Sequence, residues 1–180
     1  ELYMPWGADN QLPYRIRELI GSDEVTAQNK FFNVLTCYGA GLRLLGADGK
    51  ETKHPDALRF ARRNALSTFF LEQTTDMKYF FFAVCVVILS RDGSRINRLA
   101  HKDACFCRLS KADKRGRIKY VYYANWQYGT PDASDIERIP LLSETDPFGD
   151  LAVRMGREPG ADGVTRQRTS PRTFAIPLRL

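Results

Sequence analysis

The spacing of apolar residues predicts helices in the first part of the chain. A first helix should start near Pro13 and end at Gly21, after which Ser22 is the expected N-cap of a second helix. This second helix should bury one stripe of residues at helical spacing: Ala27, Phe31, Val34 and Tyr38. After a short strand at 42–45, the pattern from Pro55 onward predicts one further helix of about five turns.

From residue 79 the pattern changes to that of strands. Residues 79–89 form a continuous apolar run of 11 residues, which is typical of a strand covered on both faces. The turn at 91–94, Arg-Asp-Gly-Ser, predicts a hairpin that leads into an antiparallel strand at 95–100. Further strands are expected at 104–109, 118–126 and 136–142. We therefore expect one antiparallel β-meander within residues 77–143.

The chain after the meander mixes different kinds of element. A short helix at 147–155 should begin at the N-cap residue Asp146. Glycine and proline make 156–172 a predicted loop, and the run 174–180 has the composition of a strand. We describe 144–180 as an irregular C-terminal segment.

Composition fits a single structural domain. The 180 residues are 43% hydrophobic, and a chain of this length buries about 70% of its unfolded surface without disulfides or metals. We predict an α+β fold in which a mainly helical part, 1–76, packs on the meander at 77–143, with 144–180 completing the domain. Because the sequence lacks an initial Met and stops inside a strand-like run, we expect it to be a segment of a longer protein.

Positive charge is concentrated in one region. The net charge is +6, but residues 91–119 alone carry ten Lys and Arg against three Asp and Glu, whereas residues 120–149 carry one against five. The cations around the expected turn are Arg108, Lys111, Lys114, Arg115, Arg117 and Lys119, and the aromatics that follow are Tyr120, Tyr122, Tyr123 and Trp126. Such a set binds single-stranded nucleic acid when the cations contact phosphates and the rings stack on bases. The alternative is a solvated hairpin tip with ordinary strand aromatics.

Sets of residues that support catalysis are scarce. The two histidines are His54, expected at the surface before a helix, and His101, near Cys105 and Cys107. On one strand the two cysteines would have their Cβ atoms about 6.5–7 Å apart, too far for both to bind one zinc ion. The sequence has no Walker-type loop and no dinucleotide-binding fingerprint. We therefore predict no enzymatic activity, no metal and no cofactor.

Cysteine usage and hydropathy bear on the cellular environment. The four cysteines are too few for a disulfide framework, which favours a reducing compartment. The longest nearly uncharged apolar run has 12 residues, whereas a helix needs about 20 to cross a bilayer. We expect no association with a membrane.

The order of these features resembles the N-terminal part of tailed-bacteriophage portal proteins, over most of residues 5–180. One matching segment is the opening run 5–14, PWGADNQLPY, and another is 29–42, a helix that ends in glycine before a Gly-Leu strand. The third is the apolar strand with its turn at 79–93, followed by 96–104 and the aromatic strand 118–124.

The resemblance implies a structural role and a homo-oligomer. Portal proteins form a ring, typically of twelve copies, at one capsid vertex, through which double-stranded DNA is packaged and ejected. Capsid, terminase and neck or tail proteins bind this ring, and ATP is hydrolysed by the terminase. The present chain would be the wing region, with the family's stem and clip following it. Its expected location is the virion, and the host cytoplasm before assembly.

Two other hypotheses remain open at this stage. One is a stand-alone nucleic-acid-binding module that uses the hairpin 108–126. The other is a cysteine- or metal-dependent enzyme centred on His101.

Overall fold

The computed structural model describes residues 2–156 and 172–179, and these confirm the predicted α+β class. The helices are α1 (Leu12–Ser22), α2 (Glu24–Tyr38), α3 (Pro55–Arg63), α4 (Leu66–Phe80) and α5 (Pro147–Arg154), and two short 3₁₀ turns are η1 (Ala104–Phe106) and η2 (Ala133–Asp135). The strands are β1 (Phe82–Leu89), β2 (Ile96–Lys102), β3 (Cys107–Leu109), β4 (Tyr120–Tyr123), β5 (Glu137–Pro140) and β6 (Thr173–Arg179). They form two antiparallel sheets of three strands, ordered β2-β1-β6 and β3-β4-β5.

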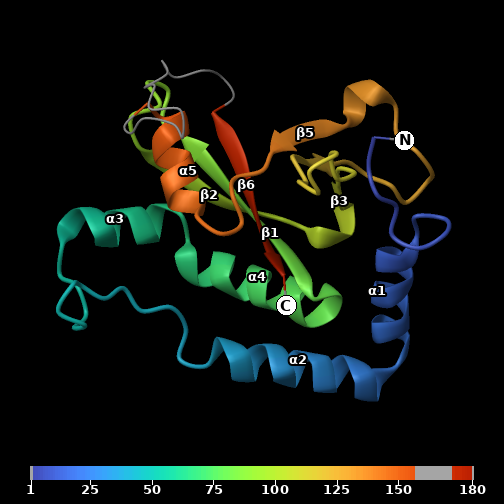
Figure 1. Ribbon diagram of the computed structural model, residues 1–180. Coiled ribbons are helices and arrows are strands. Elements are labelled where there is room, and N and C mark those ends of the chain that lie inside the picture. Colours follow the sequence, from blue (N-terminus) through green and yellow to red (C-terminus); the bar gives the residue numbers. More distant parts are fainter. Residues whose placement is uncertain (1, 157–171, 180) are drawn as a thin grey trace.

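The core lies on both faces of β1, the central strand of the first sheet. Successive residues of a strand point to opposite faces, so neighbouring positions of β1 contact different layers. On one face Val84 packs with Val121 and Ile139, which belong to the second sheet. On the other face Val87 packs with Leu151 of α5. Helix α4 lies between α2 and the sheets, and α2 follows the lower edge of the molecule (Figure 1).

The prediction of one meander across 77–143 is wrong, because the strands divide between two sheets. The hairpin of β1 and β2 is confirmed, with Val86 opposite Ala100. The second neighbour of β1, however, is β6, in which Ala175 lies opposite Val86. The segment predicted as irregular thus supplies one strand of the main sheet, together with α5, which begins at Asp146 as expected. Most of the predicted loop, 157–171, lies outside the described residues.

The prediction of one long helix from Pro55 is also wrong. The chain breaks between α3 and α4 at Ala65, whose backbone is left-handed with φ 45° and ψ 50°. The buried side chain of Asn64 accounts for the break, since its amide donates to the carbonyl of Phe60 and its oxygen accepts a hydrogen bond from the backbone of Leu99 on β2. The end of α3 is therefore fixed to the sheet.

Other boundaries differ from the prediction by a few residues. Helix α1 continues through Gly21, and Asp23 rather than Ser22 caps α2 by accepting a hydrogen bond from the backbone N–H of Thr26 (3.0 Å). Strand β1 starts at residue 82, because α4 extends to residue 80 and Phe81 adopts a left-handed conformation that ends it. The predicted strand at 42–45 is reduced to a single bridge between residues 45 and 51.

Candidate functional site

The six basic residues that were predicted to bind nucleic acid do not form one surface. Arg108 is fully buried, whereas the other five are exposed: Lys111, Lys114, Arg115, Arg117 and Lys119. Asp113 closes the turn that carries them, because its carboxylate accepts hydrogen bonds from the backbone N–H groups of Arg117 (3.0 Å) and Arg115 (2.8 Å) and pairs with the Lys119 ammonium (3.1 Å). These bonds lower the pKa of Asp113 to about 2. The turn is therefore a defined loop that presents positive charge to solvent.

Arg108 has a structural task inside the protein. Its guanidinium donates to the carbonyls of Cys105 (2.9 Å), Cys107 (2.8 Å) and Asn10 (3.0 Å), and also to the side-chain oxygen of Asn10. The guanidinium carbon lies 5.4 Å from the centre of the Trp126 ring. Burial lowers the pKa of Arg108. Arg108 thus joins the N-terminal segment to η1 and β3, and its guanidinium does not reach the surface where a phosphate would bind.

The aromatic residues after the turn already contact protein groups. Tyr122 and Trp126 are buried. The centre of the Tyr120 ring lies 3.6 Å from the guanidinium carbon of Arg138, and the centre of the Tyr123 ring lies 4.0 Å from the ammonium of Lys102. Stacking on a nucleic-acid base would require these rings to give up those contacts. The cations and aromatics that adjoin in the sequence therefore do not make a combined phosphate and base site.

His101 forms a pair with a carboxylate that no sequence pattern singles out. Its Nε2 lies 2.7 Å from Oδ2 of Asp76 on α4, and the same oxygen accepts a hydrogen bond from the backbone N–H of Ala104 (2.8 Å). Burial by itself would lower the pKa of His101, but two nearby carboxylates favour the charged ring more strongly, and the net effect is a raised pKa. They belong to Asp76 and to Glu72, whose Oε2 lies 3.8 Å from Nδ1 of His101. The pair joins α4 to β2 and η1. Residue spacing could not reveal it, because the two partners lie on different elements.

The cysteines near His101 are buried. Cys105 lies in η1 and not on a strand, contrary to the prediction, so it does not share a strand face with Cys107. Burial raises the pKa of Cys105 to about 11 and that of Cys107 well above its usual value, which keeps both thiols protonated. Within residues 2–156 and 172–179, no three His, Cys, Asp or Glu side chains are grouped to hold a metal ion.

In the part of the chain that the structure describes, no helix is both long and apolar enough to span a membrane.

A row of exposed apolar side chains follows one flank of α2. We call it the α2 ridge, and its members are Val25 (66% exposed), Phe31 (60%), Phe32 (68%) and Leu35 (43%). Leu35 follows Phe31 by four positions and Phe32 by three, so these three side chains are neighbours on the helix. Val25 lies two turns before Phe32 on the same flank, with the exposed residues Gln28 and Asn29 between them. Val34, three residues after Phe31, is buried. The prediction that Phe31 belongs to the buried stripe is wrong, because it lies at the margin where α4 no longer covers α2.

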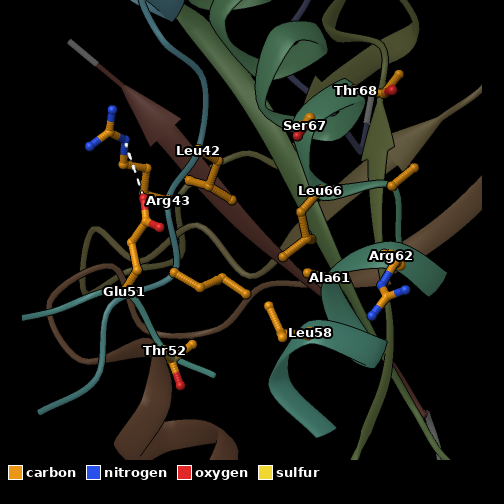
Figure 2. A pocket seen from close by; sticks show the side chains of 12 residues that line it. Leu42, Arg43, Glu51, Thr52, Leu58, Ala61, Arg62, Leu66, Ser67 and Thr68 are labelled. Carbon is orange, nitrogen blue, oxygen red and sulfur yellow. Dashed lines mark ion pairs between the residues drawn. The ribbon is translucent and has the colours of Figure 1, made fainter. Parts of the chain in front are cut away.

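A groove of about 370 Å³ lies between the segment 42–52 and the helices α3 and α4. Figure 2 shows apolar side chains that line it, among them Leu42, Leu58, Ala61 and Leu66. At one end Arg43 and Glu51 form an ion pair (3.8 Å), and Arg62 lies at the other end (Figure 2). We call this feature the α3 groove. It combines an apolar floor with charged ends, as protein-binding surfaces often do.

No family model matches this sequence, and no curated protein matches it either.

Proposed function

We propose that the chain is a structural subunit of a phage portal ring, in its wing region. In this role it would form part of a homo-oligomer at a capsid vertex, through which double-stranded DNA is packaged and ejected and to which head-tail connector proteins attach. Capsid and terminase are the other partners of such a ring. The proposal starts from the order of sequence features and is supported by surfaces suited to protein contacts.

The observation that carries the proposal is the α2 ridge. Phe31 and Phe32 each expose more than half of their surface and lie beside Leu35, which is 43% exposed. Contiguous apolar patches on a soluble chain mark sites of protein or membrane contact, whereas isolated exposed apolar residues carry no such meaning. A ring requires two unlike surfaces on each copy, since each subunit meets its two neighbours through different patches. The ridge and the α3 groove are two such surfaces.

Assembly of the complete gene product tests this proposal. Multi-angle light scattering should give the mass of a closed oligomer, and electron microscopy should show a ring with a central channel. A complete product that stays monomeric at high concentration would contradict the proposal.

A nucleic-acid-binding module is the second candidate, favoured by the exposed cations of the 111–119 turn. It predicts that retention on DNA falls steeply with salt and is abolished by the double change Arg115→Glu and Arg117→Glu. The matched control is Arg91→Glu with Arg95→Glu, an equal change of charge at another exposed turn. If both pairs change retention by the same amount, the effect is one of net charge and this candidate is rejected.

A further inference from the structure

We propose that the α2 ridge of one copy docks into the α3 groove of the next copy of this chain, head to tail. The inference rests on the proposed function, since it names the contact that would join neighbouring subunits. Its occupant is a second copy of the chain, because one chain carries both an apolar projection and an apolar recess. The residues that line the groove come from 42–52, α3 and 65–68, so the groove belongs to a different part of the surface from the ridge.

The first argument is the match between apolar surfaces. Phenylalanine side chains are among the largest contributors to interfaces, and each buries about 150–250 Å². The ridge presents two of them, Phe31 and Phe32, on a helix that packs against α4. The groove offers leucine and alanine side chains as its floor (Figure 2). A helical ridge of this kind fits the general mode in which an amphipathic helix enters an apolar groove.

The second argument is complementary charge at the edges of the two surfaces. The corner between α1 and α2, next to Val25, carries three exposed acidic residues: Glu18, Asp23 and Glu24. Helix α3, one wall of the groove, carries three exposed arginines, of which Arg62 lines the groove. Arg59 pairs with Asp56 (3.5 Å), and Arg63 donates a hydrogen bond to Asn97 on β2. Opposite charges around an apolar centre fix the register of an interface and disfavour other pairings. The acidic corner of one copy would therefore meet Arg62 of the next.

A symmetric contact of ridge with ridge fits less well. In an antiparallel pair of α2 helices, the acidic corner of each copy would approach the end of the other helix. Residues 33–42 at that end carry no charged side chain, and the next cation, Arg43, is already paired with Glu51. The head-to-tail arrangement gives the acidic corner a cationic partner. In an open row of subunits, it also leaves a free ridge at one end and a free groove at the other.

Removing one ridge residue tests the contact. Phe32→Asp should weaken self-association of this chain at least tenfold, measured by sedimentation equilibrium, because central aromatic residues dominate interface energies. The matched control is Phe148→Asp on α5, a phenylalanine that is 73% exposed and belongs to neither surface. Circular dichroism should show that both variants keep the fold, since neither side chain is buried.

Mixing variants distinguishes the head-to-tail contact from a symmetric one. Ala61→Arg places a long side chain in the groove, and Arg62→Glu, an exposed change, is a second groove variant should the first fail to fold. Each variant alone should be monomeric or weakened. A mixture of Phe32→Asp with a groove variant should form dimers of nearly wild-type affinity, because one partner keeps an intact groove and the other an intact ridge. These dimers should not grow further.

The outcomes separate the two proposals. Association that Phe32→Asp leaves unchanged, a mixture that does not recover, or a wild-type chain that stays monomeric at all concentrations would overturn the docking inference. If the complete gene product still forms rings in those cases, the proposed function stands and other surfaces hold the ring. If the mixture forms dimers but the complete product forms no ring, the docking inference stands and the proposed function fails.

Discussion

Replacing Arg108 should destabilise the fold and leave any binding of DNA unaffected in the molecules that remain folded. In the variant Arg108→Met, an unbranched apolar side chain fills most of the same space. The carbonyls of Cys105, Cys107 and Asn10 then lose the donor that they share. The N-terminal segment also loses the two hydrogen bonds that Arg108 makes to Asn10.

The size of the effect follows from two opposing terms. Each hydrogen bond to a charged group contributes about 1.5–3 kcal/mol, and Arg108 makes four of them. Against this loss, an apolar side chain avoids the cost of burying a charge, which returns about 1–4 kcal/mol. Four such bonds contribute about 6–12 kcal/mol, so we expect a net loss of at least about 2 kcal/mol in the free energy of unfolding. That is a large share of the roughly 5–15 kcal/mol that stabilises a typical domain.

Urea unfolding followed by circular dichroism measures this loss. Arg115→Met is the control, since Arg115 is exposed on the neighbouring turn and its replacement should change stability by less than about 0.5 kcal/mol. Hydrogen exchange should show faster opening of the N-terminal segment in the Arg108 variant. A loss below about 1 kcal/mol for Arg108→Met would refute the role that we assign to the buried guanidinium.

Three further predictions concern other parts of the fold. The pKa of His101 is raised, so the pair that it forms with Asp76 stabilises the fold fully below pH 6.5, the ordinary pKa of histidine, and this stabilisation is lost as the pH rises through the raised pKa. Urea unfolding at a series of pH values should show this decline, and the variant His101→Gln should not show it. Ala65→Gly should raise the thermal midpoint by relieving a left-handed alanine, a gain of about 0.5–1 kcal/mol, whereas Ala61→Gly within α3 should cost about 1 kcal/mol. In the folded protein an alkylating reagent should modify the exposed Cys37 and not the buried Cys107, as peptide mass spectrometry will show; equal modification of both would contradict the assigned burial.

Features specified by neighbouring residues could be predicted from the sequence. The hairpin between β1 and β2 follows from its Asp-Gly turn, and α5 follows from the cap formed by Asp146. The α+β class follows from the change of apolar spacing near residue 79. In each case the interactions that decide the structure lie within a few positions of one another, so the local pattern contains them.

Features that depend on distant partners could not be predicted. Arg108 looks like a surface cation in the sequence, and only the approach of Asn10 and Trp126 explains its burial. The break at Ala65 depends on a hydrogen bond that the Asn64 side chain accepts from the backbone N–H of Leu99 on β2, a contact across 35 positions. The exposure of Phe31 likewise depends on how far α4 covers α2. Spacing along the chain predicts which residues share a face, and the tertiary packing decides which face is covered.

The position of β6 has a consequence for how the protein reaches its native state. Phe82 to Ile88 pair with Arg179 to Thr173, so the main sheet closes across about half of the chain. Pairings of such long range make folding slow, and during synthesis the edge of β1 remains open until its last partner has left the ribosome. An open apolar strand edge is a template for aggregation. The yield of native protein should therefore depend on protecting nascent chains at this stage.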